Sequence, residues 1–185
     1  MKKFLMGVFI SAFLFACNNE KKENTETTTA TPTATTDKKM VDELLDMSEG
    51  DVVKNAMMAF SKGDVDGMTA NYDDNILYLW SGLDSLRGKK AVQDYYKGRW
   101  KLIDSLNYSE NIVVPLKANI QQSQYAPTGK WILYWTLGHV KYKNGKKLDF
   151  WVHSANHIND AGKIDFIAQY LDRHPIMEAT KDMAK

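Results

Sequence analysis

Between residues 48 and 103, apolar residues recur every three or four positions, which is the spacing of helices that bury one face. This pattern predicts a helix over residues 48–62, a second helix that Asp64 caps, and a third over residues 89–103. A short strand is expected over residues 76–80. The first half of the folded part is therefore predicted to supply about three helices.

After residue 103 the spacing of apolar residues changes to two, which is typical of half-buried strands. Four strands are expected, over residues 112–120, 131–142, 148–158 and 164–172. Because Pro115 has no N–H to donate, its strand is predicted to be at a sheet edge or bulged. Helices first and an antiparallel meander last predict an α+β fold.

The turn at Asn144-Gly145 determines which side chains share a face of the predicted sheet. A two-residue turn there would place Thr136 opposite His153 and Gly138 opposite Trp151; the register at residues 159–162 is left open. One face then mixes aromatic and polar side chains: Tyr134, Thr136, Asp149, Trp151, His153, His157, Phe166, Tyr170 and Asp172. The other face is apolar: Trp131, Leu133, Trp135, Leu137, Phe150, Val152, Ile167 and Leu171.

The apolar face predicts an assembly. A sheet that helices cover on one side normally shows polar residues on the other, and monomers rarely expose a large apolar patch. We therefore expect a homodimer in which this patch meets a second copy through Trp131, Leu133, Trp135, Leu137, Phe150 and Val152. The alternative is that the faces are reversed and that the apolar set faces the helices.

The first 39 residues differ in composition from the rest of the chain. Lys2 and Lys3 precede an apolar run of signal-peptide length, which ends at Ala16-Cys17. This junction resembles a bacterial lipobox, although Phe15 is bulkier than is usual there. We expect residues 1–16 to be a cleaved signal peptide, Cys17 to carry the lipid that anchors the protein, and residues 17–39 to form a disordered tether rich in Thr, Ala and Pro.

Residues 40–185 are then expected to form one domain, held at a membrane of the bacterial cell envelope on its periplasmic or surface side. The alternative is an ordinary signal peptide or an uncleaved anchor, with Cys17 incidental. Since Cys17 is the only cysteine, no internal disulfide is expected.

Charge and spacing exclude several classes of function. The net charge of +1 becomes −1 when Lys2 and Lys3 are removed with residues 1–16, which contain no acid, so no nucleic-acid partner is expected. His153 and His157 are four residues apart on a strand, roughly 13 Å, which is too far for one metal ion. No phosphate-binding glycine loop, dinucleotide fingerprint or Ser-His-Asp order is found, and neither a metal nor a cofactor is expected.

Three stretches, in this order, resemble SnoaL-like domains. Residues 59–76 resemble the opening segment, with Gly63-Asp64 between two helices and Tyr72-Asp73-Asp74 after them. Residues 86–92 resemble the arginine-glycine segment that leads into the next helix, and residues 162–172 resemble the closing strand with its tyrosine-x-aspartate end. The superfamily includes nuclear transport factor 2, ketosteroid isomerase, scytalone dehydratase and the polyketide cyclases.

This resemblance implies a cone: a curved antiparallel sheet wrapped around about three N-terminal helices, with a pocket inside. It also implies that Asp172 lines the cone, where cyclase-like members can use such an aspartate as a base. His153 is the candidate partner for proton transfer. The alternatives are that Asp172 only ends the strand, paired with Arg173 or a backbone amide, and that His153 is structural.

The candidate ligand pocket comprises side chains that are alternatively part of the core: Trp80, Trp100, Tyr134, Thr136, Trp151 and Tyr170. Two functions remain open. One is an envelope lipoprotein whose cone binds a small apolar or aromatic ligand or a partner protein. The other is a cofactor-free isomerase, dehydratase or cyclase that uses Asp172 with His153. The sequence favours the first, because no complete acid and base pair can be named.

Overall fold

The computed structural model describes residues 42–120 and 123–183. The expected signal peptide, Cys17 and the tether over residues 17–39 lie outside these residues. The helices are α1 (Asp51–Ser61), α2 (Val65–Met68), α3 (Lys89–Trp100) and α4 (His174–Thr180), with a 3-10 turn at Met47–Gly50. The strands are β1 (Glu43–Leu44), β2 (Tyr72–Trp80), β3 (Ser85–Arg87), β4 (Ile103–Ala118), β5 (Gly129–Tyr142), β6 (Lys147–Ile158) and β7 (Ile164–Tyr170).

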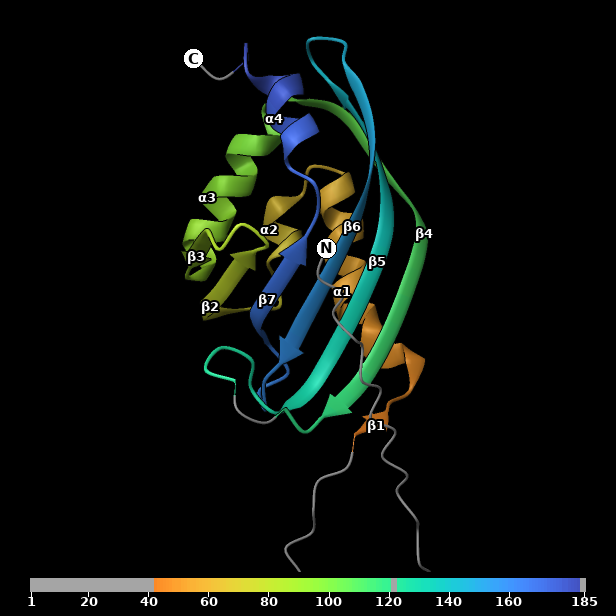
Figure 1. Ribbon diagram of the computed structural model, residues 1–185, viewed down its shortest axis with the longest axis vertical. Helices are drawn as coiled ribbons and strands as arrows, with labels where there is room; N and C mark the ends of the chain where they lie inside the picture. The colour runs from red at the N-terminus through yellow and green to blue at the C-terminus, as the bar shows by residue number, and fades with distance from the viewer. Residues whose placement is uncertain (1–41, 121–122, 184–185) are drawn as a thin grey trace, which may run out of the picture. The chain divides into compact units, whose positions relative to one another are not determined.

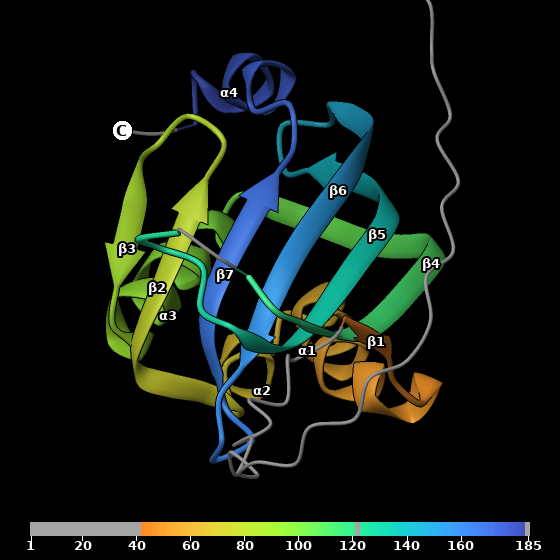
Figure 2. The same ribbon diagram turned by 60° about the horizontal axis from the view of Figure 1, so that its bottom comes forward.

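These strands form one curved, mostly antiparallel sheet of seven strands in the order β1-β4-β5-β6-β7-β2-β3. Strands β4 to β7 form the expected meander, whereas β2 pairs in parallel with β7. Helices α1, α2 and α3 lie on one side of the sheet, and the sheet curves around them (Figures 1 and 2). The predicted α+β class and the cone-shaped sheet around three N-terminal helices are confirmed.

The end of α1 and the start of α2 lie where the sequence pattern predicts them, and single residues explain both. Gly63 adopts a φ of 81°, which a residue with a side chain rarely takes, and this ends the helical path after α1. Asp64 then caps α2, since its Oδ1 accepts a hydrogen bond from the Gly67 N–H at 2.7 Å. Helix α4, which follows the last strand, was not predicted.

The hairpin between β5 and β6 differs from the prediction by one residue. The Gly145 N–H donates to the Tyr142 carbonyl, and the Tyr142 N–H donates to the Lys146 carbonyl, so the loop has three residues. Gly145, with a φ of 86°, supplies the left-handed position that such a loop requires. As a result Trp135, and not Thr136, lies opposite His153.

This shift exchanges the two faces of β6 and β7 relative to β5, because neighbouring residues of a strand point to opposite sides. Side chains of β5 lie as expected, with Tyr134 and Thr136 fully buried on the helix side. Four residues expected on the outer face instead lie on the helix side: Phe150, Val152, Ile167 and Leu171. Conversely, Trp151, His153 and Tyr170, expected inside, lie on the outer face.

Strand β4 is irregular, as Pro115 suggested, but the irregularity does not lie at Pro115 itself. The register shifts between Ser109 and Ile112, where Glu110 adopts a φ of 51°, while Pro115 itself pairs regularly with Ile132. Only the end of β4 has a partner on its other side, the two residues of β1. Proline is therefore accommodated on a strand that is close to the sheet edge.

Two groups of apolar side chains hold the fold together. The larger lies between the sheet and the helices and includes Phe60, Ile76, Val92 and Ile164. The smaller, formed by Trp131, Phe166 and Ala168, lies on the outer face of the sheet, packed against Ile120 and Ala126. Within the described part of the chain, no helix is long and apolar enough to cross a membrane.

Candidate functional site

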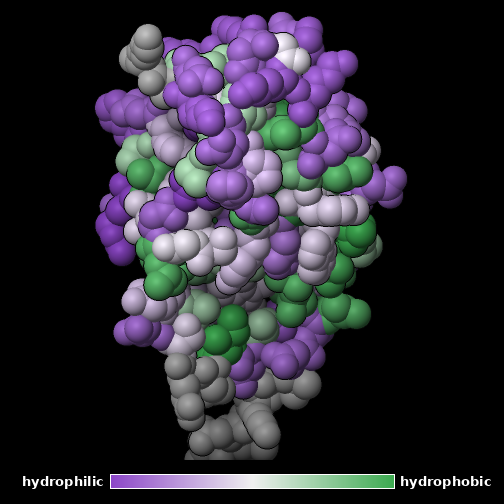
Figure 3. Space-filling model, turned by 45° about the horizontal axis from the view of Figure 1, so that its top comes forward, coloured by the Kyte–Doolittle hydropathy of each residue, from purple (hydrophilic) through white to green (hydrophobic). Residues whose placement is uncertain are grey.

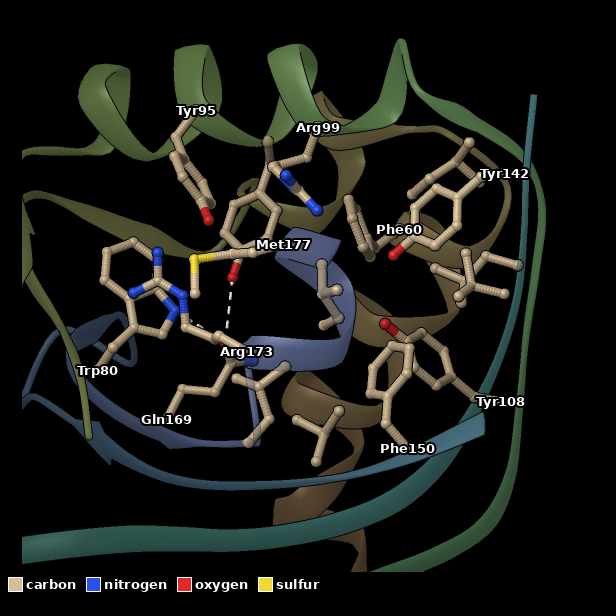
Figure 4. A pocket seen from close by; sticks show the side chains of 17 residues that line it. Phe60, Trp80, Tyr95, Arg99, Tyr108, Tyr142, Phe150, Gln169, Arg173 and Met177 are labelled. Carbon is tan, nitrogen blue, oxygen red and sulfur yellow. Dashed lines mark hydrogen bonds between the residues drawn. The ribbon is translucent and has the colours of Figure 1, made fainter. Parts of the chain in front are cut away.

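A cavity of about 110 Å³ lies between the helices and the inner face of the sheet. Each element contributes the residues that its period directs inward: alternate residues of the strands, and residues three or four apart on the helices. Figure 4 shows these side chains converging on a common space. They are Phe60, Trp80, Tyr95, Tyr96, Arg99, Ile103, Leu106, Tyr108, Val140, Tyr142, Phe150, Val152, Gln169, Leu171, Arg173, Ile176 and Met177.

Aromatic rings in mutual contact form one wall of the cavity. Tyr96 meets Phe60 edge to face at 5.1 Å, and Tyr95 lies 5.0 Å from both Tyr96 and Trp80, all distances between ring centroids. Such pairs add stability beyond the area that they bury and restrict the rotation of each ring. The wall is therefore held in shape without a ligand.

One end of the cavity is covered by the C-terminal segment. Ile176 and Met177 of α4 face inward, and α4 lies over the end of the cone (Figure 1). Hydrophilic side chains gather on the outside of this end of the molecule (Figure 3). Helix α4 thus covers only part of this end, since Met177 remains about half exposed.

A buried hydrogen-bond chain positions the polar groups at the base of the wall. The Gln169 Oε1 accepts from Trp80 Nε1 at 3.1 Å and from the Tyr96 hydroxyl at 3.3 Å. The Tyr96 hydroxyl also lies 2.6 Å from that of Tyr78. Burial raises the pKa of both tyrosines well above its ordinary value. These phenols therefore stay neutral at physiological pH.

Two further phenols reach the open space. Figure 4 shows the hydroxyls of Tyr108 and Tyr142 directed toward the centre of the cavity. Burial raises the pKa of Tyr108 far above its ordinary value, and burial also raises that of Tyr142. Arg99 partly opposes the second rise, through its charge and a hydrogen bond to Tyr142. Both hydroxyls are thus neutral and able to donate a hydrogen bond to a ligand.

Two guanidinium groups complete the lining. Arg173 hydrogen-bonds to Asp84 and lies 5.2 Å from the centre of the Trp80 ring, and the bond to Asp84 raises the pKa of Arg173. Arg99 of α3 is half-buried, and among the described residues it makes no ion pair with a carboxylate. The cavity therefore contains one paired and one unpaired positive charge.

The chain is similar to known proteins in its fold. No protein-family model and no curated protein matches the chain. Among solved structures, an NTF2-like protein of unknown function from Burkholderia pseudomallei is similar, with a TM-score of 0.53 and 13% identity over 70% of this chain and 95% of its own. A putative polyketide cyclase from Xanthomonas campestris has a TM-score of 0.53 and 15% identity, over 71% of this chain and 96% of its own.

AclR, a putative hydroxylase from Streptomyces galilaeus, has a TM-score of 0.54 and 10% identity, over 74% of this chain and 98% of its own. The similarities cover nearly the whole of each of these structures. The chain has the NTF2-like fold. Identities this low establish the shape of the domain, and its chemistry has to be derived from its own side chains.

Within this fold, the two candidate catalytic residues lie outside the cavity, and each interacts with different partners. His153 stacks between Trp135 and Tyr170 on the outer face, with ring centroids 4.4 and 5.7 Å away. Asp172 is exposed after the end of β7, and its Oδ1 accepts a hydrogen bond from the His174 N–H at 2.9 Å. The structure thus does not bring them together as a proton-transfer pair.

The candidate pocket residues are divided between three places. Trp80 lines the cavity. Tyr134 and Thr136 are buried on the helix side, where Tyr134 donates a hydrogen bond to Asn111, and Trp100 packs against Phe60 at a centroid distance of 5.4 Å. Trp151 and Tyr170 are about half exposed, at 53% and 50%, on the outer face. The expected cavity of Tyr134, His153, Tyr170 and Asp172 is therefore wrong, because of the register shift in β6 and β7.

The sequence analysis missed the polar residues that line the cavity, chiefly Arg99, Tyr108 and Gln169. One signal was present: Arg99 follows Val92 and Tyr96 on the face of the third helix that the periodicity assigns to the interior. A charged residue on a buried stripe indicates a polar function for that position. The inward direction of Gln169 could not be predicted, since it depends on the register of β6 and β7.

Contrary to the expectation from the sequence, a serine, a histidine and an aspartate that follow one another in this order are hydrogen-bonded on the outer face, across β4, β5 and β6. The Ser109 hydroxyl lies 2.9 Å from His139 Nε2, and His139 Nδ1 lies 2.8 Å from Asp149 Oδ1. The side chains of His139 and Asp149 are 39% and 71% exposed, so that water screens the pair. Without an enclosing pocket, this series is a cross-strand polar network and not a second site.

Proposed function

We propose that this protein is a lipid-anchored envelope protein whose conical domain binds a small aromatic molecule without transforming it. The observation that carries the proposal is the aromatic cavity itself. An engineered apolar cavity of about 150 Å³ holds benzene, so a space of about 110 Å³ that also opens to solvent accommodates a single ring. Aromatic walls and a few fixed polar groups are typical of small-molecule sites.

The lining residues favour binding over catalysis. Isomerases, dehydratases and cyclases that act without a cofactor require a group that accepts a proton from the substrate. None of the residues around this cavity, all within the described part of the chain, is Asp, Glu, His, Cys or Lys. The phenols of Tyr96, Tyr108 and Tyr142 have raised pKa values and hold their protons. Such a site orients a ligand and excludes water but has no base for proton transfer.

A solved protein of the same fold was crystallised together with an organic compound. TerC, with a TM-score of 0.52 and 11% identity over 72% of this chain and 98% of its own, was co-crystallised with polyporic acid. For this chain, the equivalent ligand is the molecule that fills the space beside Trp80 and Tyr96.

The proposed anchor rests on the N-terminal sequence: two lysines, an apolar run, and Ala16-Cys17. Acylation of Cys17 would hold the domain at the membrane through several acyl chains, which anchor stably where a single chain does not. Cys17→Ala should therefore move the protein from the membrane fraction to the soluble fraction. Fractionation with membranes as before would exclude lipidation at Cys17 as the anchor.

The ligand proposal is tested by filling the end of the cavity. Ile176 lines the cavity from α4, so Ile176→Trp should occupy ligand space, whereas Glu178→Trp adds the same side chain at an exposed position of the same helix. Calorimetric titration with benzamide, a neutral single-ring probe, should show saturable binding for the wild type and for Glu178→Trp. The Ile176→Trp protein should bind at least about tenfold more weakly, since losing the contacts of one ring costs more than about 1.4 kcal/mol.

Thermal unfolding of both variants serves as the control that they are folded. If the wild type binds neither benzamide nor benzoate, the cavity is not a ligand site of this size. Equal binding by a folded Ile176→Trp protein would place the ligand elsewhere.

A further inference from the structure

The cavity contains a positive charge that no carboxylate of the described residues neutralises. The side chain of Arg99 extends from α3 into the cavity, between Tyr95 on one side and Phe60 and Tyr142 on the other (Figure 4). Arg173 has Asp84 as its partner, but Arg99 makes no ion pair within the described residues. A half-buried guanidinium without a counter-charge is unfavourable, because burial weakens its hydration.

The other polar groups of the cavity are mostly hydrogen-bond donors. Within the described residues, every fully buried side-chain oxygen or nitrogen has a hydrogen-bond partner. The hydroxyls of Tyr95 and Tyr108 have no such partner among these residues, so they are not fully buried and reach the open space of the cavity. The Gln169 Oε1 already accepts two hydrogen bonds, which leaves its amide N–H groups as donors. A ligand that matches this lining supplies acceptors and a negative charge.

We propose that the ligand is an aromatic carboxylate, and that Arg99 binds its carboxylate group while the ring lies against the aromatic wall. This proposal rests on the function proposed above and adds the chemical class of the ligand. A guanidinium matches a carboxylate in shape, because two parallel N–H groups donate to its two oxygens. The Tyr142 hydroxyl, which already interacts with Arg99, is a further donor.

Benzoate and benzamide form the test pair, since they have nearly the same shape and differ in charge. A hydrogen bond to a charged group contributes more than a neutral one, and two such bonds correspond to a preference of about tenfold to one hundredfold. The wild type should therefore bind benzoate more tightly than benzamide by that factor in calorimetric titrations at neutral pH.

Arg99→Met should abolish the preference, because it weakens the binding of benzoate by a larger factor than the binding of benzamide. Arg99→Lys keeps the charge but loses the paired N–H geometry, so it should retain only part of the preference. The matched control is Lys101→Met, which removes one positive charge from an exposed position two residues further along the chain. It should bind both probes as the wild type does.

Each outcome separates the two proposals. Equal binding of benzoate and benzamide by the wild type would overturn the carboxylate proposal and leave the aromatic site intact. A preference that survives in Arg99→Met, or that Lys101→Met loses to the same extent, would show that Arg99 does not contact the ligand. Failure of both probes to bind would instead overturn the function proposed for the cavity.

Discussion

Gly98 and Gly145 both face open space, yet they have opposite backbone conformations. A methyl group added at Gly98 or at Gly145 would meet no atom within 4 Å. Gly98 lies inside α3 with a helical backbone, whereas Gly145 has a φ of 86° at the turn between β5 and β6. Substitution by alanine therefore isolates the effect of backbone conformation from that of packing.

We expect opposite signs from the two substitutions. Gly145→Ala should lower the free energy of unfolding by about 1 kcal/mol, because a side chain is strained in the left-handed region. Gly98→Ala should raise it by about 0.5–1 kcal/mol, because alanine restricts the unfolded chain more than glycine does. Urea unfolding of both variants measures this difference. A destabilised Gly98→Ala protein, or an unaffected Gly145→Ala protein, would contradict the conformational explanation.

Single residues also show where the sequence was ambiguous. The alternative given for Asp172, a carboxylate that ends a strand and accepts from a backbone amide, matches its bond to the His174 N–H. Short acidic side chains often accept such local hydrogen bonds. The sequence alone could not separate this role from that of a base, because both require the same residue at the same place.

At the scale of elements, the sequence predicted the order of helices and strands well. The periods of three to four and of two are local properties, and each is visible within about ten residues. Strands β5, β6 and β7 lie within one or two residues of their predicted limits. The pairing of β2 with β7 was not predicted, since it joins segments that share no local signal.

The faces of the sheet depended on a single turn. A loop of three residues in place of two at Asn144-Gly145 reversed every side chain of β6 and β7 relative to β5. Their relative arrangement was nevertheless correct, since His153 and Tyr170 are neighbours on one face. Trp151, His153 and Tyr170 were misplaced for this one reason, whereas Trp80 on β2 and the β5 residues Tyr134 and Thr136 were unaffected.

At the scale of the whole molecule, no helix among residues 42–120 and 123–183 lies over the outer face of the sheet (Figure 2). The register shift brings polar side chains such as Asp149 and His153 onto this face, but an apolar patch remains on it. Trp131 is covered at one end, and Phe150 and Val152 line the cavity, so these three cannot form the expected interface. The outer face retains Leu133, Trp135 and Leu137, joined by Ile112, Trp151 and Tyr170, of which the last three are about half exposed.

We propose that this face pairs with the same face of a second copy, since one self-complementary patch is sufficient for a two-fold dimer. Trp135 lies in the middle of the patch, stacked on His153. Trp135→Glu should yield a folded monomer in sedimentation experiments, because a charge buried between two copies is unfavourable. Asn55→Glu, which adds the same charge on the exposed side of α1, should remain dimeric. A wild-type protein that sediments as a monomer would refute the dimer.

The parallel pair β2–β7 joins the two halves of the domain: Leu77 lies opposite Phe166, which is 89 positions later in the chain. During synthesis, β2 has no partner on this side until residues 164–170 have been made. Contacts this distant in sequence form slowly, because the loop between them must first be closed. In the proposed export of the chain before it folds, this delay would keep β2 unpaired on this side during transit. Because β7 comes late in the domain but lies in the interior of the sheet, the sheet stays open until residues 164–170 are available.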